Sequence, residues 1–190
     1  MSLDGAEQAV VDHLTAAPGP VTWASPPSPG GWVAQVRDGG GESADLATVR
    51  FRKSRAFPGC QLHEVDFATR EGRREHLLVR TWQEPDGSWT ADPIGGGSGG
   101  EPYRSKPWVN FAAQWNAQLF AAGGHVTGQG AEQARLVRLT FADGTAIEDV
   151  PGNGVVLFFA SAGVVFPARV EILSDAGDLL AEYDEFNDLD

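Results

Sequence analysis

The stretch Arg135–Tyr183 decides the fold class of this chain. It reads RLVRLTFADGTAIEDVPGNGVVLFFASAGVVFPARVEILSDAGDLLAEY and alternates short apolar runs with turn-forming residues. Val155–Phe159 and Val164–Phe166 are continuous apolar runs, rich in β-branched and aromatic residues and bounded by Gly or Pro. Such runs favour buried strands over helices. About six short strands at this spacing are typical of a β-sandwich or barrel.

Turn chemistry predicts the strand registers in this stretch. Gly144 is the third residue of the loop Ala142–Gly144 and supplies the left-handed residue of a bulged three-residue hairpin turn. This turn sets Leu139 opposite Ile147, whereas a two-residue turn would set Leu139 opposite Glu148. A one-residue slip moves every side chain to the other face, so the hydrophobic pattern favours the three-residue turn.

The turn Asp175–Gly177 has the same chemistry. Its bulged register pairs Ile172 with Leu180 and Leu173 with Leu179. The unbulged register would set Glu171 against Glu182, and a like-charge cross-strand pair is destabilising. We therefore predict the bulged register for this hairpin.

Composition argues against several classes of function. The formal net charge of −12 over 190 residues argues against nucleic acid or an anionic membrane as a partner. No apolar run approaches the ~20 residues of a membrane-spanning helix, and no basic region precedes an apolar one at the N-terminus, so we expect a cytoplasmic protein. Cys60 is the single cysteine and the four histidines lack zinc-ligand spacing, so we expect no disulfide, metal or other cofactor.

The charge is unevenly distributed along the chain. From Glu132 to Asp190 there are twelve acidic and three basic residues, whereas Arg50–Arg80 contains eight basic and four acidic residues. The segment Glu182–Asp190 is acidic with interleaved apolar residues. It is either a solvated terminus or an arm that docks on the basic region of its own chain or of a second copy.

Residues 1–94 are predicted to form an α+β module. Asp4–Ala17 carries an apolar stripe at helical spacing and begins with a capping-box pattern, Asp4 followed by Glu7. Strands are expected at residues 21–23, 32–37 and 46–53, and a strand meander follows them.

Glycine-containing turns at residues 70–72 and 85–87 set the registers of the meander. They place Val65 opposite Leu77 and Gln83 opposite Trp89. The helix is expected to cover the apolar face, which comprises Val49, Phe51, Val65, Phe67, Leu77, Val79 and Trp89.

A Gly- and Pro-rich stretch, residues 95–107, is predicted to be a flexible connection. The second module, residues 108–190, is predicted to contain an amphipathic helix, an immunoglobulin-like β-sandwich and the acidic tail. The helix is expected to end at Gly123-Gly124, and residues 108–130 could also belong to the first module. Its apolar stripe comprises Trp108, Phe111, Ala112, Trp115 and Leu119.

The reverse face of the meander gathers the polar residues that are candidates for chemistry: Glu64, Asp66, His76, Arg80 and Trp82. The register sets Asp66 opposite His76, and a carboxylate beside an imidazole is the arrangement of a general base. Asp66 and His76 are therefore the candidate catalytic residues. Glu64, Arg80 and Trp82 are candidate ligand-binding residues, with Arg80 holding an anionic group and Trp82 forming an apolar wall. The alternative is a solvated sheet face with ordinary cross-strand pairs.

Two resemblances accompany these patterns. The helix followed by a meander resembles small curved-sheet α+β folds such as those of cystatins and nuclear-transport-factor-like proteins. The motifs Phe-Ala-Asp-Gly-Thr, Gly-Val-Val-Leu-Phe-Phe and Pro-Ala-Arg-Val-Glu-Ile-Leu-Ser-Asp-Ala-Gly resemble the C-terminal half of uncharacterised actinobacterial proteins. These motifs are turn and strand chemistry and imply no catalytic residue.

These patterns favour a mainly β protein that is a non-enzymatic intracellular binding or protein-interaction module. Its partner would be another protein or a second copy of the chain. The alternative is a small-ligand enzyme or sensor that uses Asp66, His76 and Arg80 in a pocket of a curved sheet. The two functions differ in whether the polar face is enclosed.

Overall fold

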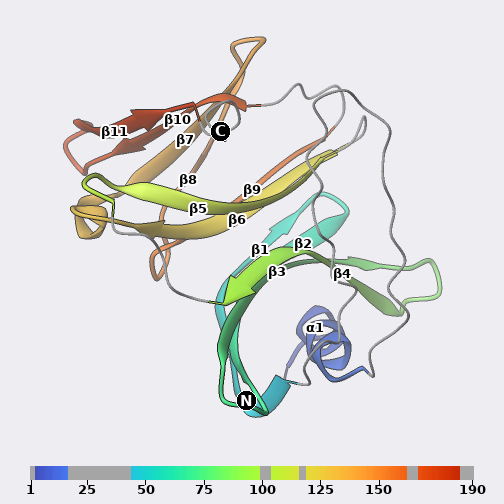
Figure 1. Cartoon of the computed structure of the whole chain (residues 1–190). Helices are drawn as coiled ribbons and strands as arrows, with labels where there is room; N and C mark the ends of the chain where they lie inside the picture. Colours follow the sequence, from blue (N-terminus) through green and yellow to red (C-terminus); the bar gives the residue numbers. More distant parts are fainter. Residues whose placement is uncertain (1–2, 17–43, 99–103, 116–118, 162–166, 185–190) are drawn as a thin grey trace, which may run out of the picture. The chain divides into compact units, whose positions relative to one another are not determined.

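The structure is a computed structural model that describes residues 3–16, 44–98, 104–115, 119–161 and 167–184. The chain forms two compact units, Met1–Gly99 and Gly100–Asp190. The described residues form one α-helix, a short 3-10 helix and three antiparallel sheets, so the fold is mainly β as expected (Figure 1). The strands predicted at residues 21–23 and 32–37 lie outside the described residues. No helix in the described ranges is long and apolar enough to cross a membrane.

Helix α1 (Gly5–Thr15) begins with the predicted capping box. The Asp4 carboxylate accepts a hydrogen bond from the Glu7 backbone N–H at 2.8 Å, and the Glu7 carboxylate accepts one from the Asp4 N–H at 3.3 Å. These bonds satisfy donors that a helix N-terminus leaves without partners. The apolar stripe buries Ala6, Val10 and Leu14.

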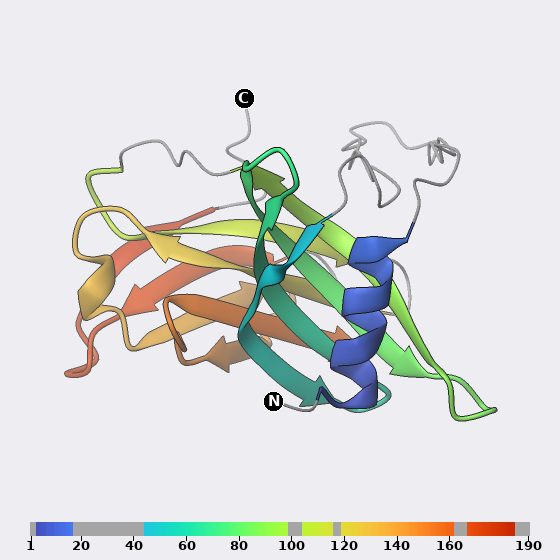
Figure 2. The same ribbon diagram turned by 90° about the horizontal axis from the view of Figure 1, so that it is seen from below.

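The first sheet is a meander of β1 (Ala44–Phe57), β2 (Cys60–Thr69), β3 (Arg74–Gln83) and β4 (Trp89–Ser98). The predicted registers are confirmed: Val65 lies opposite Leu77, and Gln83 lies opposite Trp89. Helix α1 packs on one face of this sheet (Figure 2). The apolar core there contains Val10, Leu14, Ala44, Val65 and Val79, with Val49, Phe51, Phe67, Leu77 and Ala91 packed against it.

The prediction that residues 95–107 form a flexible connection is wrong at its start, because strand β4 extends to Ser98. Residues 95–98 continue the strand, so the connection does not begin at Gly95. Gly96 lies against the backbone carbonyl of His76, where an added Cβ atom would collide with it. The glycines therefore permit close strand approach at this position, a role that composition alone does not distinguish from a linker.

The second unit contains two sheets around one core. In chain order its elements are β5 (Trp108–Trp115), β6 (Leu119–Thr127), the 3-10 helix η1 (Ala131–Gln133), β7 (Leu136–Phe141), β8 (Ala146–Asp149), β9 (Val155–Ser161), β10 (Pro167–Leu173) and β11 (Leu179–Tyr183). The sheet orders are β5-β6-β9 and β11-β10-β7-β8. Both sheets contribute to the core, which includes Val109, Phe120, Phe158, Leu139, Phe141 and Ile172. Val164–Phe166 lies outside the described residues.

The amphipathic helix predicted from residue 108 is wrong. Residues 108–115 form strand β5, which pairs with β6 along its whole length. Val109, Phe111 and Ala113 belong to the core of the second unit at alternate positions, so the apolar residues of this stretch fit a strand period of 2 as well as the helical period. Pairing with β6 decides between the two periods.

The hairpin of β7 and β8 has the predicted register, with Leu139 opposite Ile147. In the hairpin of β10 and β11, Leu173 lies opposite Leu179, as the bulged register predicts. A register shift between Ile172 and Leu173 then sets Ile172 opposite Ala181 rather than Leu180. Ile172 and Ala181 are both buried, so the shift places the Ala181 side chain in the core.

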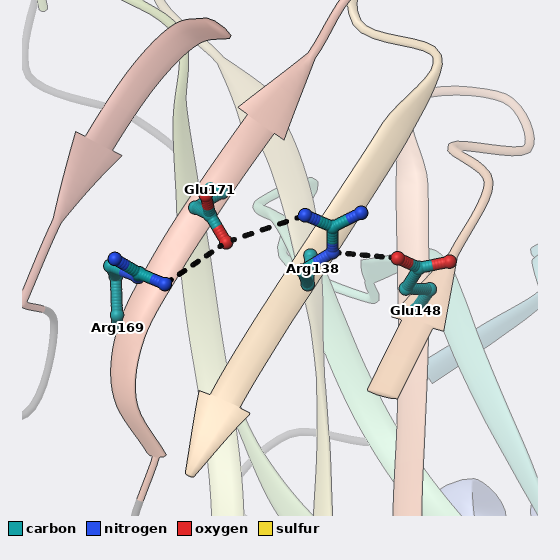
Figure 3. A network of polar contacts seen from close by, with 4 residues as sticks. All are labelled: Arg138, Glu148, Arg169 and Glu171. Carbon is teal, nitrogen blue, oxygen red and sulfur yellow. Dashed lines mark hydrogen bonds and ion pairs between the residues drawn. The ribbon is translucent and has the colours of Figure 1, made fainter. Parts of the chain in front are cut away.

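The same shift sets Glu171 opposite Glu182, the like-charge pair that the sequence argued against. Arg138 and Arg169 offset this repulsion, because their guanidinium nitrogens lie 3.7 Å and 3.8 Å from Glu171 Oε2 (Figure 3). Arg138 also binds Glu148 across the β7–β8 pair. Core packing therefore outweighs one unfavourable pair on the outer face.

Two polar contacts join the sheets of the second unit. The Tyr183 hydroxyl on β11 accepts a hydrogen bond of 2.8 Å from the backbone N–H of Val109 on β5. The Tyr183 ring stacks on Trp108 with 3.9 Å between the ring centroids. The Asp149 carboxylate on β8 accepts a 2.7 Å bond from the Leu157 N–H on β9. Each contact supplies a hydrogen-bond partner to a backbone group of a buried residue, Val109 or Leu157.

Candidate functional site

The polar candidates lie on the face of the first sheet that points away from α1. Glu64 and Asp66 alternate with core residues along β2, and His76, Arg80 and Trp82 do the same along β3. The β2–β3 register places Asp66 directly opposite His76, as the sequence predicted.

The imidazole forms its hydrogen bond with a different carboxylate. His76 Nδ1 lies 2.9 Å from Glu64 Oε1, while Asp66 Oδ2 lies 3.4 Å from Arg52 Nε. Glu64 reaches His76 diagonally, which its longer side chain permits. The side chain of Glu64 is 1% exposed and that of Asp66 is 38% exposed, so Glu64 is the buried carboxylate at the imidazole.

The Glu64–His76 geometry has a chemical consequence. An ionised carboxylate only accepts hydrogen bonds, so with Glu64 ionised the proton of this contact belongs to His76 Nδ1. A neutral imidazole in this tautomer carries its lone pair on Nε2. The pair therefore orients the ring in the manner that acid–base chemistry requires.

Arg80 belongs to a second polar group on the same face. Its Nη2 donates a 2.8 Å hydrogen bond to Asp92 Oδ2, and its guanidinium carbon lies 4.9 Å from the centroid of the Trp82 ring. The Trp82 indole N–H donates to Glu84 at 2.8 Å, and the Thr90 hydroxyl donates to the same oxygen. The arginine and the tryptophan are thus held in fixed positions from two strands.

The sequence pointed to neither Asp92 nor Glu84. The contact of Arg80 with Asp92 could be predicted from the sequence. The turn at residues 85–87 sets Gln83 opposite Trp89, and the same register sets Arg80 opposite Asp92. The same register therefore predicts the ion pair when it is extended along the two strands.

Cys60 begins β2 near this group. Burial raises the pKa of the Cys60 thiol, and the positive charge of Arg80 opposes the shift without cancelling it. The thiol therefore stays protonated at neutral pH and is a poor nucleophile.

His63 lies on the opposite face of β2, among the core residues near α1. Its Nδ1 is 2.9 Å from the Ser54 hydroxyl and its Nε2 is 3.0 Å from the Thr81 hydroxyl. Burial lowers the pKa of His63 to about 4, and the nearby charge of Asp4 opposes this shift. His63 is therefore a neutral core residue at physiological pH.

We predict strong coupling between Glu64 and His76. The variant His76→Leu should lower the free energy of unfolding by roughly 2–3 kcal/mol, because it removes a hydrogen-bond partner from a buried carboxylate. The double variant E64L/H76L should lose less free energy of unfolding than the sum of the losses in E64L and H76L, because it removes both members of the pair together.

Urea denaturation of the four proteins measures this coupling. The matched control is the exposed pair Arg52–Asp66, for which the cycle R52Q, D66N and R52Q/D66N should give a coupling below about 1 kcal/mol. Additive losses in the Glu64–His76 cycle would contradict the prediction.

Comparisons of this chain with protein-family models, with curated proteins and with solved structures find no match.

Proposed function

We propose that the protein is a non-enzymatic protein-interaction module that contacts its partner along the outer edge of β1. The observation that carries this proposal is an ordered bulge in a long edge strand. Strand β1 has 14 residues and ends the sheet order β1-β2-β3-β4. Leu46, in the bulge, is one of the exposed large apolar residues, with 52% of its surface accessible.

The register defines the bulge. Asp45 lies opposite Ala68 and Arg50 lies opposite Asp66, so residues 46–49 on β1 span the position of a single residue, Phe67, on β2. Bulges at sheet edges bend the strand and redirect side chains. Here the insertion holds Leu46 away from the core.

Hydrogen bonds hold the bulge in place. The Asp45 carboxylate accepts from the Ala47 N–H at 3.1 Å, and the Thr48 hydroxyl donates to the Asp45 carbonyl at 2.6 Å. The Thr48 oxygen also accepts from the Ala68 N–H on β2 at 2.8 Å. A contact residue on such an ordered segment binds without a large ordering cost.

Edge strands bind partner chains through a general property of sheets. Their outward backbone N–H and C=O groups can pair with an added strand, and side-chain contacts then select the partner. A strand of β1's length, with an apolar residue held outward at one end, has the features of such a binding edge.

Site-specific photo-crosslinking tests the proposal. A benzoylphenylalanine at position 46 should give an adduct of one discrete mass in cells. The same probe at Leu179, which is 53% exposed in the second unit, should not give that adduct. After mass spectrometry identifies the adduct, the purified partner should bind the wild type and L179D but not L46D. Equal adducts at both positions, or equal binding by both variants, would contradict the proposal.

The Glu64–His76 pair favours a second candidate function, a small-ligand enzyme or sensor. An imidazole oriented by a buried carboxylate is the feature that supports it. Native mass spectrometry of the purified protein should then show an additional mass of a few hundred daltons, on the scale of a small cofactor or drug-sized ligand. H76Q should lose this mass if the ligand binds at the pair.

We also propose that the second unit is immunoglobulin-like. The order of its strands supports this proposal. The first, second and fifth strands pair in one sheet, as strands A, B and E do in that fold. The seventh, sixth and third strands pair in the other sheet, as G, F and C do, and β8 takes the place of C′ beside C.

A further inference from the structure

We infer that the pair Asn153 and Gly154 is a site of spontaneous covalent modification, at which the folded chain converts asparagine to isoaspartate. The pair lies in the second unit, in the connection between β8 and β9, and both residues are exposed. An asparagine before a glycine is the arrangement in which the next backbone nitrogen reaches the side-chain amide with the least hindrance, because glycine has no Cβ atom.

The pair occupies the two central positions of a tight turn. The φ angles of Asn153 and Gly154 are 53° and 75°, and positive values at both central positions are typical of a type I′ turn. Gly152 and Val155 close the turn with backbone hydrogen bonds of 3.0 Å and 2.9 Å in opposite directions. Asparagine is among the few residues with a side chain that tolerate a left-handed backbone. The turn therefore favours the same dipeptide that is chemically labile.

The reaction needs only these two residues and water. The backbone nitrogen of Gly154 attacks Cγ of Asn153, a C–N bond forms, and the side-chain nitrogen leaves as ammonia with the proton of the Gly154 N–H. Water then opens the resulting cyclic imide at one of its two C–N bonds. One opening restores the normal main chain and gives aspartate, and the other leaves the chain linked through the side-chain carbon, which is isoaspartate. Neither step needs an oxidant or a reductant.

The surroundings of Gly154 leave its nitrogen available for this attack. The Gly154 carbonyl accepts a 2.7 Å hydrogen bond from the Val126 N–H, but none of the hydrogen bonds in the described part of the chain uses the Gly154 N–H. A Cβ atom added at Gly154 would meet nothing within 4 Å, so no neighbouring group covers this residue. Attack within one chain also avoids the entropy cost of bringing two molecules together.

Isoaspartate would open the connection between β8 and β9. Linkage through the side chain adds a methylene group to the main chain, which a two-residue turn of fixed geometry does not accommodate. The bonds between Gly152 and Val155 would be lost, and the bond from Val126 that ties the turn to β6 would be weakened. Because β9 begins at the buried residue Val155, the modified second unit should be less stable.

Prolonged incubation of the folded full chain at mildly alkaline pH tests the inference. Peptide mapping by mass spectrometry should show a gain of about 1 Da at Asn153, the difference between an amide and an acid. Conversion at Asn153 should be at least roughly tenfold faster than at Asn110. Asn110 is the internal control, because it is exposed but is followed by Phe111 and is paired with β6 along strand β5.

A purified isoaspartyl methyltransferase, which methylates the free α-carboxylate of isoaspartate, identifies the product. It should label the aged wild type and should label aged N153G much less. Glycine adopts the same φ without strain, so N153G keeps the turn while it removes the reactive amide. Thermal unfolding should show a second transition at lower temperature in the aged wild type but not in aged N153G.

Three results would overturn the inference. Asn153 could stay intact in the folded chain while the peptide Val-Pro-Gly-Asn-Gly-Val-Val converts under the same conditions, which would show that the turn protects the pair. Equal labelling of aged wild type and aged N153G would place the isoaspartate elsewhere, for example at Asp143 before Gly144. Unchanged thermal unfolding of a fully converted chain would show that isoaspartate does not open the connection.

Discussion

Acidification towards pH 4 is expected to lower the stability of the first unit by about 3 kcal/mol through His63 alone. Its side chain is fully buried, and both ring nitrogens are hydrogen-bonded to hydroxyl groups of Ser54 and Thr81. The Phe51 ring packs on it edge-on, at 5.7 Å between the centroids. A proton on this ring would place a charge in a largely apolar environment, where Asp4 at the N-cap of α1 is the acidic group that opposes the shift.

The sign follows from the two pKa values. Burial lowers the pKa of His63 from 6.5 in the unfolded chain to about 4 in the folded chain. Between these values the unfolded state binds a proton that the folded state does not. The stability contribution is therefore complete above pH 6.5 and is lost as the pH falls towards 4.

Urea denaturation of the wild type and H63Q at several pH values measures this effect. The glutamine amide can still bond to hydroxyl groups, but it does not titrate in this range. The difference in unfolding free energy between the two proteins should shift by about 3 kcal/mol between pH 7 and pH 4 in favour of the variant. Parallel pH profiles would show that His63 has the same affinity for protons in both states.

Replacement of Gly124 by alanine is expected to destabilise the second unit by about 3 kcal/mol or more. An added Cβ atom would collide with the backbone carbonyl of Asn110 and would lie 3.1 Å from the Cα atom of Phe111. Both contacts are to the backbone of β5, so no side-chain rotation relieves them. Strand β5 would have to move away from β6, although Val109 and Phe111 of β5 pack in the core.

The matched control for this variant is G144A. Gly144 has a φ of 85° in the β7–β8 turn, and an added Cβ there meets no atom within 4 Å. The control should cost about 1–2 kcal/mol, the penalty of a left-handed backbone for alanine. Thermal unfolding should therefore rank wild type, G144A and G124A in decreasing stability, and the reverse order of the two variants would contradict the close approach of β5 and β6.

The sequence predicted which residues of the candidate site share a face of the sheet. It did not predict which of them form hydrogen bonds and ion pairs with one another. Turn chemistry gave the register of β2 and β3, and with it the shared face of Asp66 and His76. Which carboxylate bonds to the imidazole depends on side-chain length and on Arg52, whose position requires the register shift in β1. That shift has no turn signal in the sequence.

The sequence by itself determined features that depend on neighbouring residues. The capping box of α1 and the hairpin between Leu139 and Ile147 follow from side chains or glycines within a few positions of each other. Their energies are local, so composition and spacing suffice to predict them.

Only the tertiary structure decided the features that depend on distant partners. Residues 108–115 are a strand because β6 pairs with them, and Gly96 continues β4 because it lies against β3. Glu171 faces Glu182 because the core takes Ile172 and Ala181 while arginines approach Glu171. In each case a contact between strands outweighs the local preference, since one buried face contributes more free energy than one turn or one exposed charge pair.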